Sequence, residues 1–216
     1  MTTDDAYPAE REPGAARAGR RGARRAFFAA MLRKPAQIGA VAPSSPSLAG
    51  VIASVVPTAG GPVVVELGPG TGAVTTAIDG RLDPGARHLA VELDPRMAGF
   101  LRQAHPGLEV VEGDAAKLQS LLEERGVAHA DAVVSGLPWA LFDDVTQASI
   151  LSQVADVIGP DGVFATFAYR HGMALAAARR FRRTLHATFA EVQLTPPVWR
   201  NMPPAFVYVC RHPRMT

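Results

Sequence analysis

Three acidic residues close apolar runs of the sequence and are the first candidates for chemistry: Glu66, Glu92 and Asp114. A carboxylate at such a place accepts hydrogen bonds from hydroxyl and amino groups, and two oxygens can hold a vicinal diol. If the runs are parallel strands, their carboxyl ends meet at one edge of a sheet, which is where such sheets bind ligands. The three acids therefore predict one site for a ligand with a sugar and amino groups.

Glu66 leads directly into a glycine-rich turn within the segment 63–72, VVVELGPGTG. The β-branched residues before it are typical of a buried strand, and the helix-compatible run 73–78 follows the turn. The glycines let a ligand approach without a Cβ in the way, and the free N–H groups of a helix start favour an anionic end. The segment predicts a strand, a tight turn and a helix that bind a cofactor.

Two cofactors fit this turn. The dinucleotide fingerprint G-x-G-x-x-G/A is matched by Gly68, Gly70 and Ala73, with Glu92 at the distance expected for a ribose. Glu66, however, would repel a pyrophosphate, whereas the ammonium of S-adenosylmethionine would tolerate it. A plain strand–turn–helix with capping acids is the third interpretation, and Asp94 is expected to be such a cap.

Length and composition bound the rest of the molecule. The chain has 216 residues, enough for one α/β domain, and one cysteine, so no internal disulfide forms. The first residues lack a basic and apolar signal sequence, and no apolar run is long enough to span a membrane. We expect a cytoplasmic monomer, peripheral on the inner face of the cell membrane, with no bound metal.

The N-terminal part is basic. Residues 1–16 are polar and rich in proline and alanine, which is typical of a disordered leader, and no Asp or Glu occurs from Pro13 to Val65. Arg24 to Lys34 predicts an amphipathic helix with an apolar face around Phe27 and Phe28. Such a helix suits an anionic membrane surface, an RNA arm, or a capping helix with solvated arginines. We assign 17–57 to this helix, a loop and a short helix over 48–56, whose start is marked by the N-cap Ser45 and by Pro46.

From residue 58 onward, strands and helices alternate in a single domain, 58–216. We expect strands at 62–67, 87–93, 108–112, 130–135 and 162–169, and helices at 71–79, 94–104, 115–125, 142–158 and 172–185. This alternation predicts a parallel sheet with helices on both faces. Thr188 to Leu194 and Ala205 to Cys210 have no helix between them, so they should form an antiparallel hairpin at one edge.

The combination of E-x-G-x-G, an acid after the second strand and an acid after the third resembles the class I S-adenosylmethionine-dependent methyltransferases. The resemblance implies a Rossmann-like α/β fold with a seven-stranded, mostly parallel sheet. It also implies that Glu66 to Gly72 hold the methionine end, Glu92 the ribose and Asp114 the adenine amino group. Ser135 to Trp139, SGLPW, would end the fourth strand beside the reacting methyl group.

The SGLPW segment resembles the N-L-P-Y motif of ribosomal RNA adenine dimethyltransferases, in which an Asn orients the adenine amine. Gly136 stands at the Asn position here, which counts against RNA. A closer resemblance, over residues 25–212, is to the bacterial phospholipid N-methyltransferases, which methylate phosphatidylethanolamine toward phosphatidylcholine. The matching segments are FF at 27–28, GAVAPSS at 39–45, ELGPGTG at 66–72, SGLPW at 135–139 and WRNMPPAFVY at 199–208.

This resemblance implies S-adenosylmethionine as cofactor, S-adenosylhomocysteine as product, and a phospholipid as acceptor. Tyr169, His171 and Trp139 are candidates to receive the amine proton or grip the head group, Arg170 and Arg200 to hold the lipid phosphate. Trp139, Phe142, Tyr169 and Trp199 could form a partial aromatic cage by cation–π attraction. A core or surface role is the alternative for each of them, and packing is favoured for Phe142 and Trp199. The expected cofactor residues are Ser44, Ser45, Glu66, Gly68, Gly70, Thr71, Gly72, Glu92, Leu93, Asp114, Ala115, Ser135 and Gly136.

Single sequence features count for or against the other classes of function. An RNA adenine methyltransferase would need base contacts that Gly136 removes and a helical RNA-binding domain for which no residues remain. A short-chain oxidoreductase needs Tyr-x-x-x-Lys, but neither Lys34 nor Lys117 follows a tyrosine in that way. A small-molecule or peptide methyltransferase stays open, and a non-catalytic binding module is disfavoured because all cofactor positions are intact.

Overall fold

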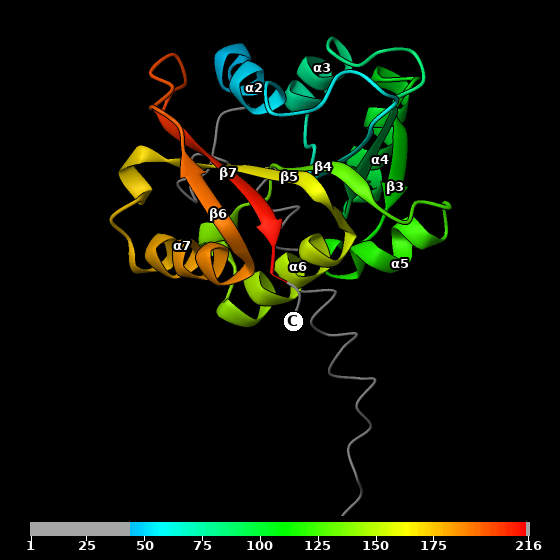
Figure 1. The fold of residues 1–216 in the computed structure, drawn as a ribbon. Coiled ribbons are helices and arrows are strands. Elements are labelled where there is room, and N and C mark those ends of the chain that lie inside the picture. The colour runs from blue at the N-terminus through cyan, green and yellow to red at the C-terminus, as the bar shows by residue number, and fades with distance from the viewer. Residues whose placement is uncertain (1–43, 215–216) are drawn as a thin grey trace, which may run out of the picture.

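The computed structural model describes residues 44–214, and the predicted leader 1–16 and basic helix 24–34 lie outside them. Seven strands form one sheet in the order β3-β2-β1-β4-β5-β7-β6 (Figure 1). Strands β1 to β5 are parallel to one another, whereas β7 is antiparallel to both β5 and β6. The predicted α/β fold, with a C-terminal antiparallel hairpin at one edge, is confirmed.

The strands begin and end close to the predicted bounds. They are β1 (Val63–Leu67), β2 (Arg87–Glu92), β3 (Glu109–Glu112), β4 (Ala130–Ser135), β5 (Ile158–Tyr169), β6 (Phe189–Leu194) and β7 (Ala205–Pro213). Strand β5 starts four residues earlier than predicted. Ala130 pairs with Ile158 and Ala132 with Val163, so the Gly-Pro-Asp-Gly segment that reads as a turn forms an irregularity within the strand.

The helices of the described chain are α2 (Pro46–Ala53), α3 (Ala73–Asp79), α4 (Pro95–Ala104), α5 (Leu118–Glu123), α6 (Asp144–Val157) and α7 (Ala176–Thr188). Short 3₁₀ turns, η2 (Ala115–Lys117), η3 (Trp139–Leu141) and η4 (Arg170–Gly172), follow the ends of β3, β4 and β5. The helix predicted at 115–125 is thus split, and the one predicted at 172–185 starts later and ends later. In both places a short 3₁₀ turn follows the strand, and the α-helix begins only after it.

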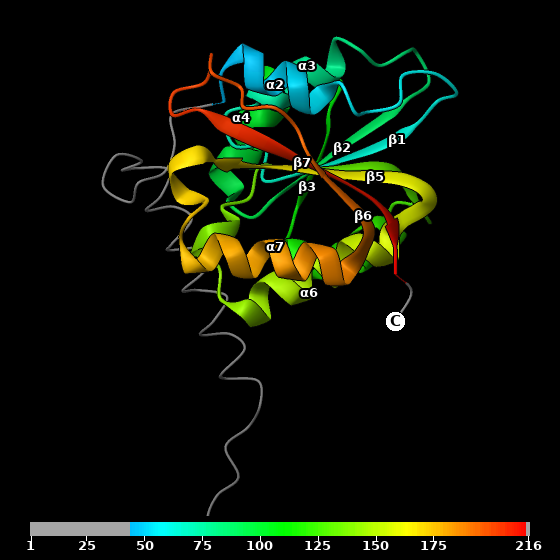
Figure 2. The same cartoon turned by 60° about the vertical axis from the view of Figure 1, so that its left-hand side comes forward.

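Helices cover both faces of the sheet (Figure 2). Helices α5, α6 and α7 pack on one face through a cluster that includes Leu122, Leu151 and Phe181. Helices α2 and α3 pack on the other face through Leu48, Ile52 and Ile78. Along β1, Val64 belongs to the second cluster and Val65 to the first, as the twofold alternation of a strand requires. The central strands are therefore apolar on both sides, as expected for a parallel sheet.

Helix α2 begins where the sequence predicted. Ser45 is its N-cap, with its Oγ accepting a hydrogen bond from the Leu48 N–H at 3.2 Å, and Pro46 occupies the first turn. The helix ends at Ala53 rather than at residue 56. Because its side chains are part of the core, this helix packs with the domain 58–216 rather than apart from it.

A buried ionic cluster links β1, β2 and α3. The Thr75 hydroxyl donates to Glu66 Oε2 at 2.6 Å. His88 Nδ1 lies 2.6 Å from Asp79 Oδ1, and His88 Nε2 lies 3.6 Å from Glu66 Oε2, an ion-pair distance rather than a hydrogen bond. Burial by itself would lower the pKa of His88, but the two carboxylates outweigh it and raise the pKa to about 9. The charged imidazole thereby ties α3 to the sheet.

The cluster predicts a specific dependence of stability on pH. Because the pKa of His88 is about 9 in the folded protein against an ordinary 6.5, protonation of His88 favours folding. Its contribution, up to about 3 kcal/mol, is complete below about pH 6.5 and lost as pH rises through about 9. Thermal unfolding should therefore show the wild-type advantage over H88N shrinking between these values. The control H186N, at an exposed histidine of α7, should follow the wild-type profile; a constant gap for H88N would contradict the assignment.

Candidate active site

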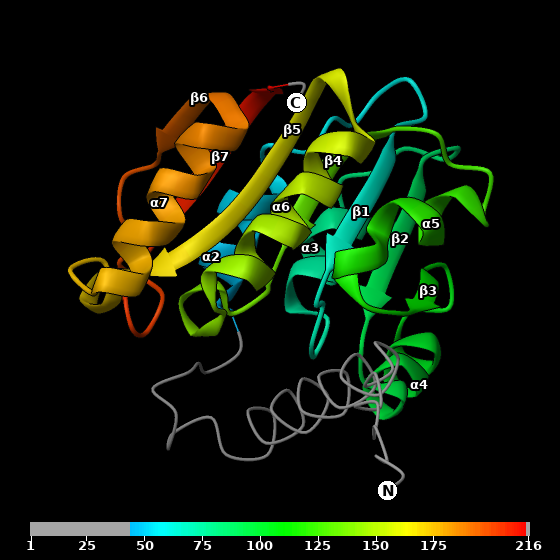
Figure 3. The same ribbon diagram turned by 90° about the horizontal axis from the view of Figure 1, so that it is seen from below.

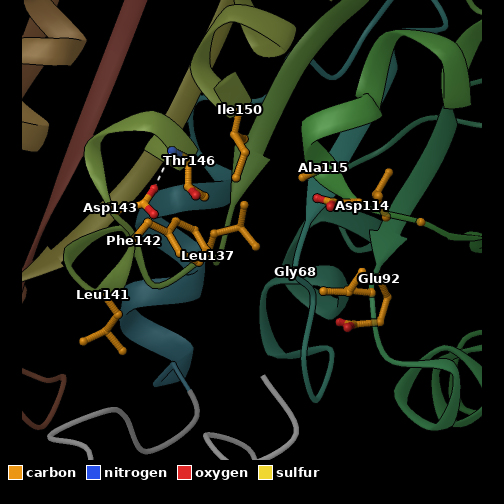
Figure 4. Close-up of a pocket in the computed structure, with 13 residues that line it drawn as sticks. Gly68, Glu92, Asp114, Ala115, Leu137, Leu141, Phe142, Asp143, Thr146 and Ile150 are labelled. Carbon is orange, nitrogen blue, oxygen red and sulfur yellow. Dashed lines mark hydrogen bonds between the residues drawn. The ribbon is translucent and has the colours of Figure 1, made fainter. Parts of the chain in front are cut away.

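A pocket opens at the carboxyl ends of the central strands, and Figure 4 shows the side chains that line it. At this edge β1 leads to α3 on one face of the sheet and β4 leads to α6 on the other, as can be followed in Figure 3. Its volume is about 340 Å³, which is in the range of small-molecule sites. Ligands of open α/β sheets bind at this kind of reversal. The pocket is lined by Gly68, Val91, Glu92, Leu93, Gly113, Asp114, Ala115, Leu137, Leu141, Phe142, Asp143, Thr146 and Ile150.

The loops around the pocket are held by backbone hydrogen bonds that continue the sheet beyond the strands. The Gly68 N–H donates to the Val91 carbonyl at 3.0 Å, and the Gly136 N–H donates to the Leu67 carbonyl at 2.8 Å. The Gly113 N–H donates in the same way to the Glu92 carbonyl at 2.9 Å. These bonds fix the backbone that a ligand would contact.

Glu92 presents one free carboxylate oxygen at the pocket. The residue is only 1% exposed, and its Oε1 accepts a hydrogen bond from the Asp94 N–H at 2.9 Å. Its buried Oε2 has no hydrogen-bond partner among the described residues. Burial raises the pKa of this carboxyl, partly offset by backbone hydrogen bonds. A buried acceptor without a partner costs free energy until a donor arrives, and a ribose hydroxyl supplies one.

Asp114 and its neighbours form a second wall. Asp114 Oδ1 accepts a hydrogen bond from the Ala116 N–H at 3.0 Å and so caps η2, and the residue lines the pocket. Leu137, Phe142 and Ile150 face it from the β4 side (Figure 4). An acid beside apolar and aromatic side chains suits a flat base with an exocyclic amino group. The residues present therefore fit an adenosine.

The glycine turn adopts the predicted conformation. Gly68, Gly70 and Gly72 have φ values of 65°, 58° and 82°, the left-handed region that side chains rarely adopt. A Cβ on Gly70 would meet no atom within 4 Å, so that position borders open space. Thr71 is exposed beside it. Of these residues Gly68 lines the pocket, whereas the methionine-end roles of Gly70, Thr71 and Gly72 remain predictions.

Glu66 lies near the end of β1, as predicted, and its side chain is held by other residues of the fold. Its side chain is 2% exposed and engaged with Thr75 and His88, and it is not among the residues that line the pocket. In the structure, this acid connects β1 to Thr75 of α3 and to His88 of β2. Its predicted contact with the ammonium of the methionine end remains a proposal.

Trp139 requires a correction. The sequence placed its ring beside the acceptor, but the side chain is 3% exposed and stacks on Phe181 with ring centroids 4.8 Å apart. Its indole N–H donates to Ser135 Oγ at 3.1 Å. Ser135 is also buried, and its hydroxyl accepts from the Leu137 N–H at 3.3 Å. Both side chains therefore shape the turn from inside the core and do not reach the pocket, because α7 supplies an aromatic partner that no local pattern reveals.

Gly136 is enclosed by backbone. A Cβ at this position would lie 2.6 Å from the Gly68 carbonyl oxygen, a distance that real contacts do not show. The Asn of the N-L-P-Y motif consequently has no room here unless the β1 and β4 loops separate. This turn cannot read a base edge in the way that motif does.

Residues 169–171 and 199–200, which were predicted to bind the acceptor, lie at the end of β5 and in the segments next to it, and none of them is among the residues that line the pocket. Tyr169 has a buried hydroxyl without a hydrogen-bond partner in the described chain, and burial raises the pKa of its phenol to about 12. His171 stacks on its ring at 5.8 Å between centroids. The Arg170 guanidinium lies 5.2 Å from the Trp199 ring centre, and Trp199 is 62% exposed, so the packing alternative for Trp199 is wrong. Arg200 is exposed next to it.

Sequence reasoning missed three supporting residues. Gln147 is fully buried on α6, and its Nε2 donates to the Trp139 carbonyl at 2.7 Å. Asp143 caps α6 by accepting from the Thr146 N–H at 2.7 Å, and both residues line the pocket. The Asp-x-x-Thr spacing is an N-cap signal that could have located this helix start, which lies two residues after the predicted one. Gln147 carries no such local signal.

Ser44 and Ser45 lie on the α2 side of the site. The Ser45 N–H donates to Asn201 Oδ1 at 2.9 Å, and its hydroxyl caps α2. Neither serine lines the pocket, so their cofactor role remains a prediction. In the described chain, no group of three or more His, Cys, Asp and Glu side chains is arranged to hold a metal ion.

The unpartnered oxygen of Glu92 predicts a loss of cofactor affinity on substitution. E92Q keeps an acceptor for the Asp94 N–H but removes the charge that would accept ribose hydroxyls. We expect calorimetry to show S-adenosylmethionine binding weakened about 10- to 100-fold, the value of one or two charge-assisted hydrogen bonds.

The matched control is E112Q. Glu112 pairs with Glu92 across β2 and β3 but is exposed and bound to Arg102 at 2.7 Å. Its substitution should leave the affinity unchanged. Equal affinities for E92Q and wild type would remove Glu92 from the site.

Comparisons with known proteins agree with this geometry. Residues 64–162 match the family described as a methyltransferase domain. Among solved structures, a TehB-like S-adenosylmethionine-dependent methyltransferase from Corynebacterium glutamicum has a TM-score of 0.57 at 17% identity, covering 88% of this chain and 99% of that one. Fibrillarin of Aeropyrum pernix, solved with S-adenosylmethionine, has a TM-score of 0.57 at 15% identity and covers 74% of this chain and 72% of that one. At such identities these likenesses show the fold.

Two sequence relatives differ in the length over which they align with this chain. Ribosomal RNA small subunit methyltransferase A of Chlorobaculum parvum is 37% identical over 85 residues, only 39% of this chain and 29% of the relative. Ornithine lipid N-methyltransferase of Singulisphaera acidiphila is 35% identical over 188 residues, covering 86% of this chain and 94% of the relative. The chain therefore belongs to the family of this lipid N-methyltransferase and is a class I S-adenosylmethionine-dependent methyltransferase.

Proposed function

We propose that the protein transfers methyl groups from S-adenosylmethionine to the primary amine of a membrane lipid. The observation that carries the proposal is the near full-length match to a lipid N-methyltransferase, which covers 86% of this chain and 94% of that relative. Two acceptors have the required chemistry. An ornithine head group offers an amine and a carboxylate, and phosphatidylethanolamine offers an amine and a phosphodiester.

The cofactor site follows from the pocket. Glu92 accepts hydrogen bonds from the ribose hydroxyls, and Asp114 accepts one from the adenine amino group. Leu93 and Ala115 lie beside the base. The glycine turn from Gly68 to Gly72 faces the methionine end, with Glu66 behind it and Ser44 and Ser45 on the far side. When bound, S-adenosylmethionine supplies a methyl group on a sulfonium that an amine can displace in line.

The turn after β4 supports an amine rather than a nucleobase as acceptor. Gly136 leaves no room for the side chain that orients an adenine. The carbonyl of Trp139 is held by Gln147, so the turn presents a fixed backbone to the reacting amine. Holding the amine in line with the methyl group can supply roughly 7–11 kcal/mol of the barrier. The match to the ribosomal RNA enzyme covers only 39% of this chain and 29% of that relative.

The amine must be neutral to react, and this end of the site is apolar enough to favour the neutral form. Tyr169 is not suited to act as a base, since burial raises the pKa of its phenol to about 12 and keeps it protonated. Its unpartnered hydroxyl can instead hold the amine, while His171, exposed and stacked on it, receives the proton. Phe142 and Tyr169 remain as aromatic neighbours for a methylated ammonium, without Trp139.

Arg170 and Arg200 lie beyond Tyr169, where the anionic group of either lipid would be. Both are exposed and close to the end of β5. A guanidinium binds carboxylate and phosphate alike, so these residues do not choose between the two head groups. An assay with each lipid distinguishes the two head groups.

Access to such an acceptor requires docking on a bilayer. In the described range 44–214, no helix is long and apolar enough to cross a membrane. We propose that the basic helix 24–34, outside the described residues, adsorbs to an anionic membrane surface on the cytoplasmic side. Each arginine near such a surface contributes about 1 kcal/mol.

The hydroxyl of Tyr169 gives a test that separates catalysis from folding. Y169F removes a buried polar group that has no partner, so unfolding temperature should stay the same or rise. Loss of the hydrogen bond to the amine should lower kcat about 10- to 100-fold, with S-adenosylmethionine affinity unchanged. Y208F is the matched control, because Tyr208 lies in the core against Met173 and should keep full activity. Full activity of Y169F would exclude the role.

The acceptor is tested with labelled S-adenosylmethionine and mixed micelles that contain either ornithine lipid or phosphatidylethanolamine. We expect labelled mono-, di- or trimethylated lipid in one arm, and the ratio of products shows how many transfers occur. If neither lipid is labelled while S-adenosylmethionine still binds, the lipid acceptor is wrong. Small amines and ribosomal RNA, assayed under the same conditions, then identify the alternative.

A further inference from the structure

An exposed apolar surface lies at the same end of the sheet as the pocket. It is formed by three side chains, Leu175, Trp199 and Met202, which are 57%, 62% and 79% exposed. We refer to these three residues as the rim surface. Single exposed apolar residues are ordinary, but three in two adjoining segments, one of them a tryptophan, call for an explanation.

The two segments are joined directly. Leu175 follows the η4 turn, and Trp199 and Met202 lie in the β6–β7 connection, 195–204. The Arg170 N–H donates to the Pro204 carbonyl at 2.8 Å, and the Arg170 guanidinium stands 5.2 Å from the Trp199 ring centre. Figures 1 and 3 show both segments beside each other at the carboxyl end of β5. The rim surface is therefore one feature of this edge of the sheet.

The connection is a built turn. Asn201 is 3% exposed, its Oδ1 accepts from the Ser45 N–H at 2.9 Å, and its Nδ2 donates to the Pro203 carbonyl at 2.7 Å. The Asn201 N–H donates to the Val198 carbonyl at 3.2 Å. With Asn201 fixed inward, Trp199 and Met202 on either side of it are held in solvent. Their exposure is thus imposed by buried hydrogen bonds.

The surroundings of the rim surface are positively charged. Residues 162–216 contain a single acidic residue, Glu191. Arg180 is paired with Asp144, whereas Arg200 is exposed without an ion pair among the described residues. The arginines of this stretch are Arg170, Arg179, Arg180, Arg182, Arg183, Arg200, Arg211 and Arg214. A tryptophan with flexible apolar neighbours and arginines is the composition of a membrane interface, where the ring sits at head-group level.

We propose that the rim surface, with Arg170 and Arg200, is a membrane-docking site that seats the mouth of the pocket on an anionic bilayer. The inference rests on the proposed lipid acceptor, since a head group can reach the pocket only if the docking surface lies at the same edge. Three projecting side chains suit shallow insertion among lipids, and they are few for a stable protein interface, which buries about 1,200–2,000 Å² in total.

Tryptophan fluorescence tests the proposal residue by residue. The chain has two tryptophans, and Trp139 is buried in the core. The full chain is mixed with vesicles of phosphatidylglycerol and phosphatidylethanolamine whose acyl chains carry bromine, a short-range quencher. We expect quenching in the wild type and none in W199F, which retains only Trp139. Flotation of wild type without any quenching would overturn the proposal, because another segment would then be docking alone.

Binding by flotation provides the second measurement. W199S/M202S should lower the vesicle partition coefficient about tenfold, and R200E at least about fivefold. The control R81E makes the same charge change at an exposed arginine in the α3–β2 connection, which leads to the amino end of β2 and not to the end where the pocket lies. It should have a smaller effect. Equal losses for R200E and R81E would mean that only overall charge matters. Calorimetry with S-adenosylmethionine checks that each variant is folded.

These readouts do not depend on methyl transfer. Quenching of Trp199 without labelled lipid in the acceptor assay would support the docking surface and refute the proposed acceptor. Labelled lipid without quenching would support the acceptor and refute the docking surface. Quenching or a spectral shift of Trp199 with RNA, and none with vesicles, would assign the rim surface to nucleic acid instead, since aromatic and arginine side chains also stack on bases.

Discussion

The close approach of two backbones, at Gly68 after β1 and Gly136 after β4, is the constraint on which the site depends. A Cβ on Gly136 would lie 2.6 Å from the Gly68 carbonyl oxygen, and one on Gly68 would lie 2.7 Å from a Leu137 methyl carbon. From this point the chain leaves β1 toward α3 on one face and β4 toward α6 on the other. The pocket lies beside this divergence, and Gly68 and Leu137 are among the residues that line it.

Two carboxylates that look equivalent in the sequence have different surroundings in the fold. Glu66 and Glu92 both occupy late positions in central strands and are each 1% exposed. Glu66 is engaged by Thr75 and by the charged His88, so it holds α3 and the glycine turn in place. Glu92 keeps a buried oxygen without a partner, and that cost is recovered when a donor binds. The neighbours, rather than the residue type, engage one acid within the fold and leave the other with a buried oxygen that has no partner in the described chain.

The segments proposed to bind the acceptor come from the two ends of the described chain. The methyltransferase domain match stops at residue 162, and the ribosomal RNA relatives share less than that. The cap of α2, the η4 turn and the β6–β7 connection lie outside it, and Asn201 joins the first to the last by its hydrogen bond with the Ser45 N–H. These segments surround the β5 end, where Tyr169 and the rim surface lie. The segments proposed to bind the acceptor thus lie mostly outside the matched methyltransferase domain, 64–162.

The sequence by itself determined the features that depend on local interactions. These are the order of strands and helices, the left-handed glycines, the Ser45 cap and the hairpin without a helix, because periodicity and turn chemistry act within a few residues. It also located Gly68, Glu92, Leu93, Asp114 and Ala115 at the pocket. Only the tertiary structure decided that Trp139 is buried against Phe181, that Trp199 is exposed, and that Glu66 meets His88. Those outcomes depend on partners distant in sequence, and whether an aromatic ring or a carboxylate faces a core or a ligand is settled by what packs against it.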